Sequence, residues 1–126
     1  MRIGSFVIAV LLVATSALAH HSNSAFDGDK VMVLTGTVIE WKWTNPHVWI
    51  VLSVDDGKGG KAQWSIEGRT PGQLVRAGWS KTTLKPRETI TVDFSPAKDG
   101  SPTGLLTRVR RPDGTVVGDP APPPAQ

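Results

Sequence analysis

The residues of this chain whose types and positions could do chemistry are its three histidines, His20, His21 and His47. The segment before His20 ends in Ala17-Leu18-Ala19, a small-x-small sequence typical of a signal-peptidase site. Cleavage between Ala19 and His20 would give His20 a free α-amine beside its imidazole. His20 could then chelate a metal ion through two nitrogens, and the imidazole of His47 could supply a third.

Such a three-nitrogen site is a histidine brace. It suits copper(II), which favours tetragonal nitrogen and oxygen ligation and stands highest in the divalent affinity series, so copper(II) is the candidate cofactor. Two alternatives remain open. The terminal amine, the backbone and His21 could hold copper without help from the fold, or His20 and His21 could form a frayed terminus while His47 caps a turn.

Among the carboxylates near the predicted strands, Glu67 is a candidate to orient His47, because metal-bound histidines commonly donate their second ring N–H to a carboxylate. Glu40 and Asp55 show no acid/base pairing by spacing. No Ser-His-Asp order or G-x-S-x-G sequence occurs, and the glycine-rich residues 57–60 lack the lysine and hydroxyl of a P-loop. We therefore expect that the protein is not an enzyme.

A second candidate site is aromatic. Three tryptophans surround the Asn45-Pro46-His47 turn: Trp41, Trp43 and Trp49. Simple alternation places Trp41 and Trp43 on the strand face opposite Leu34 and Val38, which predicts an exposed aromatic face for sugars or other flat ligands. The alternative is that these large side chains close one end of a small barrel.

The N-terminus predicts export. Residues 1–19 combine the charge of Arg2, an apolar run over residues 3–13 and the cleavage sequence, as in a Sec signal peptide. That run is shorter than the roughly 20 residues of a membrane-spanning helix, and no second apolar stretch follows. The chain has no cysteine, which excludes a lipid anchor, disulfides and thiolate metal sites. We expect a protein that is periplasmic or secreted.

Charge gives little information about partners. The net charge of +3 falls by one when Arg2 is removed, which is too small an excess to indicate nucleic acid, and export also argues against it. The expected partner is therefore an unidentified periplasmic ligand or protein. These features leave the oligomeric state open.

The mature chain is predicted to have three parts: a polar lead (residues 20–30), one domain (residues 31–117) and a proline-rich tail (residues 118–126) without a core. Residue alternation predicts strands over residues 31–43, 47–55, 61–67, 89–94 and 105–111, with Trp64 inward and Trp79 in the core. Thr70, Gln73 and Gly78 predict a capped helix over residues 71–77.

This order of elements is that of an OB-fold. We predict an all-β domain with one short helix, folded as a small five-stranded OB-like barrel. The alternative is another small β-barrel or sandwich with the helix as a lid.

In such a barrel, His20 and His47 start far apart. The lead joins the first strand at its beginning, whereas His47 follows that strand's far end. Extended residues 20–30 span at most roughly 35–40 Å, so the two histidines can meet only if the first strand is coiled. Closure in trans, between His20 of one protomer and His47 of another, is also open.

Several short sequences resemble a family of small exported bacterial proteins of unknown function (DUF6152). The matching residues are Ala19-His20-His21-Ser22, Leu34-Thr35-Gly36-Thr37-Val38, Trp43-Thr44-Asn45-Pro46-His47, Trp64 with Glu67, Gly78-Trp79 and Ala97-Lys98-Asp99-Gly100-Ser101. The resemblance covers nearly the whole mature chain and implies export, but it carries no activity. One departure is Arg87, in a turn that usually reads K-P-G-D in the family.

Overall fold

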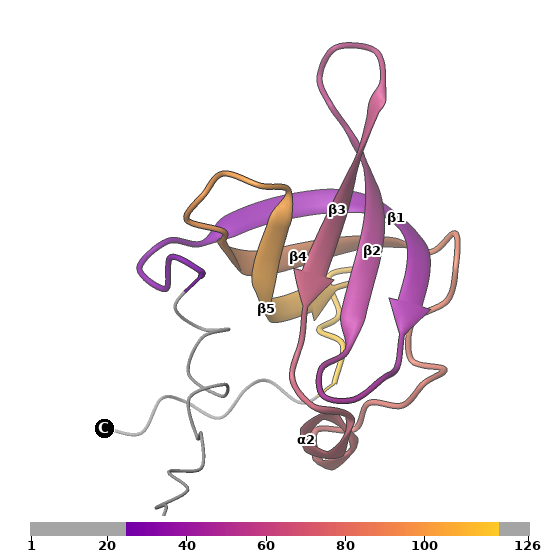
Figure 1. Cartoon of the computed structure of the whole chain (residues 1–126). Coiled ribbons are helices and arrows are strands. Elements are labelled where there is room, and N and C mark those ends of the chain that lie inside the picture. Colours follow the sequence, from indigo (N-terminus) through magenta and orange to yellow (C-terminus); the bar gives the residue numbers. More distant parts are fainter. Residues whose placement is uncertain (1–24, 119–126) are drawn as a thin grey trace, which may run out of the picture.

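Five strands and one short helix make up the described part of the chain, residues 25–118 of a computed structural model (Figure 1). The elements are β1 (Met32–Lys42), β2 (Trp49–Asp55), β3 (Lys61–Glu67), α2 (Pro71–Arg76), β4 (Thr89–Pro96) and β5 (Thr103–Arg110). All five strands and the helix occur where the sequence predicts them, with bounds that differ by at most two residues. In Figure 1 the strands curve into a barrel, α2 lies at one end, and the β2–β3 hairpin projects from the other.

The strands close into a barrel in the order β1-β2-β3-β5-β4, with β4 pairing back onto β1. Every pairing is antiparallel except that of β3 with β5. β1 is long enough to serve two neighbours, because residues 32–37 pair with β4 and residues 37–42 pair with β2. This coiled first strand and this strand order are those of an OB-fold, so the predicted fold is confirmed.

The barrel interior is filled by branched aliphatic side chains and one phenylalanine. On β2, Ile50, Leu52 and Val54 are buried at every second position, as expected for a strand with one face inward. Trp64 is half-buried and contacts Phe94 with tilted rings, whose centroids are 5.5 Å apart. The least exposed large side chains are Phe94, Ile50, Leu52, Ile66, Ile90, Val38, Val48, Val92 and Val109.

A β-bulge in β1 changes which way its tryptophans point. Val38 pairs with Leu52 and Glu40 with Val51, so Ile39 is an extra residue that shifts the alternation by one position. Trp41 therefore lies opposite the inward residue Ile50, and Trp41 and Trp43 both contact the core. The prediction that these two tryptophans face away from Leu34 and Val38 is wrong, because simple alternation does not allow for a bulge.

Helix α2 is capped as the sequence predicts. Thr70 accepts a hydrogen bond from the backbone N–H of Gln73, and the Gln73 side chain accepts one from the backbone N–H of Thr70, which completes the capping box. The helix is one residue shorter than predicted, because Ala77 has left helical geometry and serves as the C-cap. Gly78 then takes the left-handed conformation, with φ of 85°.

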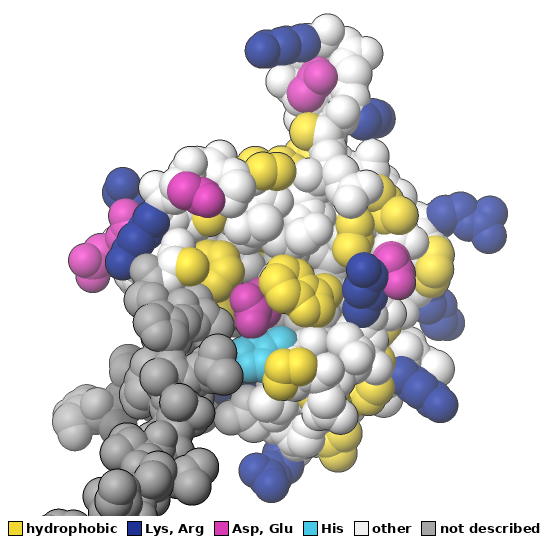
Figure 2. Space-filling model, in the orientation of Figure 1, with side chains coloured by type: hydrophobic (Ala, Val, Ile, Leu, Met, Phe, Trp, Pro, Cys, Tyr) yellow, Lys and Arg dark blue, Asp and Glu magenta, His cyan; other side chains and the backbone are white. Residues whose placement is uncertain are grey.

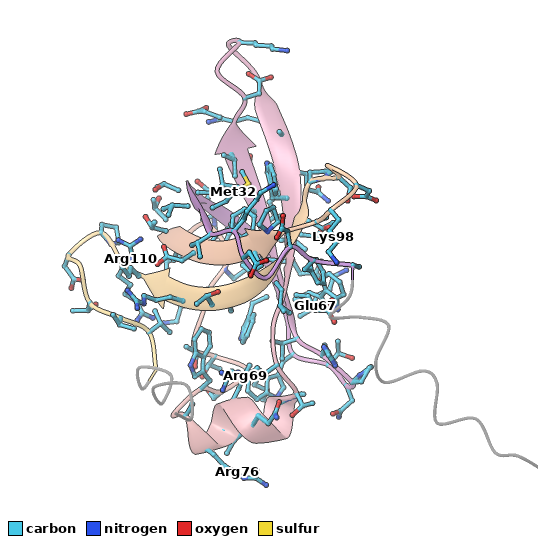
Figure 3. All side chains as sticks on the ribbon, turned by 90° about the vertical axis from the view of Figure 1, so that its left-hand side faces the viewer. Met32, Glu67, Arg69, Arg76, Lys98 and Arg110 are labelled. Atoms are coloured by element: carbon cyan, nitrogen blue, oxygen red, sulfur yellow. The ribbon has the colours of Figure 1, made fainter. Side chains whose placement is uncertain are left out.

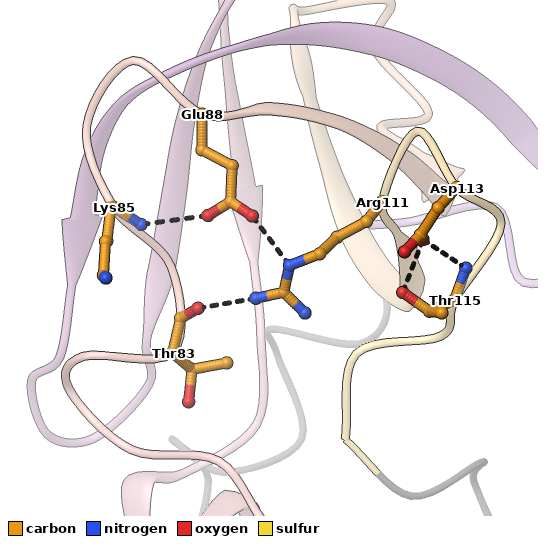
Figure 4. A network of polar contacts seen from close by, with 6 residues as sticks. All are labelled: Thr83, Lys85, Glu88, Arg111, Asp113 and Thr115. Carbon is orange, nitrogen blue, oxygen red and sulfur yellow. Dashed lines mark hydrogen bonds and ion pairs between the residues drawn. The ribbon is translucent and has the colours of Figure 1, made fainter.

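A polar network connects the loop before β4 to the segment after β5 (Figure 4). Arg111 donates from Nε to Oε1 of Glu88 at 2.8 Å and from its guanidinium to the carbonyl of Thr83 at 3.0 Å. The other carboxylate oxygen of Glu88 accepts from the backbone N–H of Lys85. Charge-assisted hydrogen bonds of this kind hold the two segments together.

The described part of the predicted lead is attached to the barrel. Phe26 is buried and forms a β-bridge with Ala97, just after β4. Two backbone hydrogen bonds flank this bridge, from Asp27 to the carbonyl of Pro96 and from Lys98 to the carbonyl of Ala25. The predicted signal peptide and residues 119–126 of the predicted tail lie outside the described residues. Within residues 25–118, no helix is long and apolar enough to span a membrane.

Candidate functional site

His47 and Glu67 are in direct contact at one end of the barrel. His47 lies just before β2, Glu67 is the last residue of β3, and the Nδ1 and Oε1 atoms are 2.6 Å apart. The side chain of His47 is 30% exposed and that of Glu67 is 11% exposed. Although the two atoms are at hydrogen-bond distance, the buried Nδ1 makes no well-aligned hydrogen bond among the described residues. The relationship is therefore a close polar contact, and it leaves Nε2 as the ring nitrogen that can bind a ligand.

Apolar neighbours explain why Glu67 is so well buried. In the sheet Glu67 pairs with Trp49 on β2 and with Leu105 on β5, so large side chains flank its carboxylate on the outer surface. A carboxylate taken out of water is costly unless it has a polar partner. His47 supplies that partner, and the contact is the one that the metal-site hypothesis required of these two residues.

A pocket opens beside His47. Its volume is about 300 Å³, and it is lined by His47, Gly68, Arg69, Gln73, Leu105 and Leu106. Figure 2 shows the histidine on this face of the barrel, next to an acidic and a large hydrophobic side chain. In Figure 3, Glu67 and Arg69 lie toward the α2 end of the barrel, while Arg76 extends from the far side of α2.

No feature of the sequence indicates this pocket. Arg69 has no motif around it, and the sequence predicts Gln73 only as a helix cap and Leu105 only as a strand residue. The pairing of β3 with β5 brings Leu105 beside Glu67 and so forms the pocket wall. Because that pairing is parallel and joins strands separated by α2 and β4, residue alternation does not reveal it.

The structure places one of the three candidate metal ligands. His20 and His21 lie outside the described residues, and His47 stands at the surface of the barrel. Between residues 25 and 118 no three His, Asp or Glu side chains come together as a metal-binding group.

The three candidate ligand-binding tryptophans divide into two groups. Trp41 lies between Trp43 and Trp79, with ring centroids 5.6 and 5.7 Å away, and it donates from Nε1 to the carbonyl of Ser80 at 3.1 Å. These contacts are those of side chains that close the end of the barrel. Trp49 is half-buried, stands apart from the core cluster and pairs with Glu67, so it is the tryptophan on the His47 face.

Comparisons with known proteins give similar solved structures and a family. The solved structures similar to this one include two crystal forms of Rim1, a mitochondrial single-stranded DNA-binding protein from S. cerevisiae. One has a TM-score of 0.49 and 9% identity and covers 71% of this chain and 95% of that chain. The other has a TM-score of 0.49 and 7% identity and covers 74% and 98%. No curated protein matches the sequence. A family profile matches residues 9–108, as the sequence motifs predicted, and the chain therefore belongs to the family of unknown function DUF6152.

Proposed function

We propose that the mature chain is an exported bacterial protein that begins at His20 and binds one copper(II) ion. The ligands are the α-amine and ring of His20 together with Nε2 of His47. The observation that carries the proposal is the contact between His47 Nδ1 and Glu67 Oε1 at 2.6 Å. Metal-bound histidines commonly have such a carboxylate on the second ring nitrogen, where it fixes the ring and raises the basicity of the ligand atom.

The attachment of the lead supports closure within one chain. Phe26 bridges to Ala97 after β4, Pro96 pairs with Gly104 on β5, and Leu105 of β5 pairs with Glu67. Three strand spacings, about 15 Å in all, therefore separate Phe26 from Glu67. The six residues from His20 to Phe26 span about 20 Å when extended, which is enough to bring His20 to His47. The lead need not run back along the whole of β1, because Phe26 already meets the barrel just after β4.

The proposed role is copper binding or delivery. Three nitrogen ligands leave a coordination position open on a tetragonal copper(II) ion. A protein that holds copper this way in the periplasm can pass it to a partner.

The decisive experiment is a competition titration of copper(II) against purified protein that begins at His20. Two variants accompany it: one with a single extra residue before His20, and His47→Ala. Sub-nanomolar binding that is lost in both variants supports the brace. His21→Ala is the matched control, because it changes the neighbouring imidazole and leaves the brace ligands intact. Weak binding that depends on His21 and not on His47 would contradict the proposal and assign copper to the terminal peptide.

Export has its own test. The full-length chain, expressed with residues 1–19 in a bacterium with a Sec system, should accumulate in the periplasmic fraction or the medium. Mass spectrometry of the intact protein should give the mass of a chain that starts at His20. An unprocessed mass, or cleavage one residue away, would remove the two-nitrogen chelate on which the proposed site depends.

A second candidate function is that of an OB-type module that binds an organic ligand on its tryptophan face, with no metal. One observation favours it: Trp49 is half-buried outside the core cluster, on the same face as His47. Ligands can be screened by the change in tryptophan fluorescence that they cause, and a change that is lost in Trp49→Phe is assigned to Trp49. This test is separate from copper binding.

A further inference from the structure

The pocket beside His47 has walls of two kinds. Leu105 and Leu106 provide apolar surface, and Arg69 and Gln73 provide polar groups. Its volume of about 300 Å³ is at the small end of the range for ligand pockets. A ligand that matches it is therefore small and carries both an apolar part and a polar head.

The polar groups that line the pocket favour a negatively charged head. Arg69 forms no ion pair within residues 25–118. The acidic side chains that form ion pairs in this part of the chain do so with other basic residues. The Gln73 carbonyl oxygen accepts from the backbone N–H of Thr70, so the group that Gln73 has left to offer is its NH₂ donor. The carboxylate nearest in sequence, Glu67, is engaged with His47 and nearly buried. Arg69 and the NH₂ group of Gln73 therefore both present hydrogen-bond donors to the pocket.

We propose that this pocket binds the carboxylate of a small organic acid. The carboxylate pairs with the guanidinium of Arg69, whose fork of N–H donors matches two carboxylate oxygens. The short apolar chain of the acid lies against Leu105 and Leu106. His47 also lines the pocket, but Arg69 and Gln73 are not ligands of the proposed copper site, so the two sites can be tested separately.

Butyrate is the probe, and the test uses metal-free protein at low ionic strength, where charge pairing is least screened. Binding is followed by the NMR shifts of the Leu105 and Leu106 methyl groups. Butyramide has the same apolar chain without the charge, and inorganic phosphate has charge without the chain. Butyrate should bind at least tenfold more tightly than either. Equal binding of butyramide would overturn the role of charge, and equal binding of phosphate would overturn the role of the apolar chain.

Variants then locate the site. Arg69→Gln should weaken butyrate binding at least tenfold, and Arg69→Lys should fall between it and the wild type because lysine keeps the charge and loses the fork. Arg76→Gln is the matched control, since Arg76 is an exposed arginine on the far side of α2 (Figure 3). An unchanged NMR spectrum outside the pocket shows that each variant is folded. Butyrate affinity that is the same in Arg69→Gln and Arg76→Gln would overturn the proposal.

The source of the carboxylate is decided by a second probe. N-acetyl-leucine presents the carboxylate and side chain of a peptide C-terminus. Tighter binding of N-acetyl-leucine than of butyrate assigns the pocket to peptide ends, and the reverse assigns it to free short-chain acids. Failure of both probes overturns the carboxylate site and leaves the copper proposal standing, because the copper titration is measured separately on His20 and His47.

Discussion

Nδ1 of His47 lies 2.6 Å from Oε1 of Glu67, and the carboxylate is the more deeply buried member of the pair. β2 and β3 bring the two residues together, because His47 lies two residues before the start of β2 and Glu67 is the last residue of β3. Trp49 and Leu105 are the neighbours of Glu67 on the two adjacent strands. Because Nδ1 of His47 is buried and the Glu67 side chain is only 11% exposed, water has little access to their contact. A polar contact in such a place is stronger than the same contact at an exposed site.

Glu67→Gln should weaken copper(II) binding by about 10- to 100-fold, the usual cost of losing a carboxylate partner of a metal-bound histidine. Glutamine keeps the shape of the side chain and removes the negative charge beside the ring. The measurement is the copper competition titration on protein beginning at His20. Glu40→Gln serves as the control, because the Glu40 side chain is 56% exposed and contacts Lys42. Equal affinities for the two variants would mean that Glu67 plays no part at the metal.

Trp41→Ala should lower the free energy of unfolding by about 2–4 kcal/mol, somewhat less than a fully buried tryptophan costs. The substitution removes the tilted aromatic contacts with Trp43 and Trp79 and the hydrogen bond to the carbonyl of Ser80. Trp49→Ala should cost under about 1.5 kcal/mol, because Trp49 stands outside the core cluster.

Urea denaturation followed by circular dichroism measures both tryptophan variants without relying on tryptophan fluorescence. The comparison also separates the roles suggested for these residues. If Trp49→Ala were the more destabilising change, the division into barrel-closing and surface tryptophans would be wrong. A loss of ligand binding in Trp41→Ala at full stability would return Trp41 to the ligand-binding group.

Gly104→Ala should destabilise the barrel by about 1–3 kcal/mol, the cost of overfilling a packed core. A Cβ at this position would overlap the ring of Phe94 at Cδ2, and the Phe94 side chain is fully buried. Adding Phe94→Leu makes room, so the double variant should lose less stability than the sum of the single losses. Gly28→Ala is the control, because a Cβ there meets no atom within 4 Å. Thermal unfolding of the four variants checks the prediction, and strict additivity would contradict it.

The secondary structure could be predicted because each element carries a local signal. Thr70 and Gln73 define the start of α2, and Gly78 marks the backbone reversal after it. β3 has the predicted bounds, because glycines before it and after it limit the strand. These signals act between residues close in sequence, and the order of elements then leaves the OB-fold as the leading arrangement.

Two features of the candidate site could not be predicted because they depend on contacts between distant residues. The bulge at Ile39 turns Trp41 inward, and no residue type in β1 specifies where the extra residue falls. The pocket depends on the parallel pairing of β3 with β5, which brings Leu105 beside Glu67. His47 and Glu67 themselves could be chosen from chemistry, since a metal-binding histidine needs an acceptor, but only the register of β2 and β3 places them in contact.

Thr115→Val should raise the pKa of Asp113 toward its ordinary value of 3.8. In the native turn, the hydrogen bond from the Thr115 hydroxyl and then that from its backbone N–H hold the pKa of Asp113 below that value (Figure 4). A lowered pKa means that the ionised carboxylate stabilises the fold. That contribution is complete above pH 3.8 and is lost as the pH falls through the lower native pKa.

NMR titration of the aspartate carboxyl carbons measures the change in the pKa of Asp113. Asp99 is an internal control, because its pKa is lowered in the same way by Ser101 and should not move. An Asp113 pKa that is the same with and without the Thr115 hydroxyl would show that the backbone N–H alone sets it.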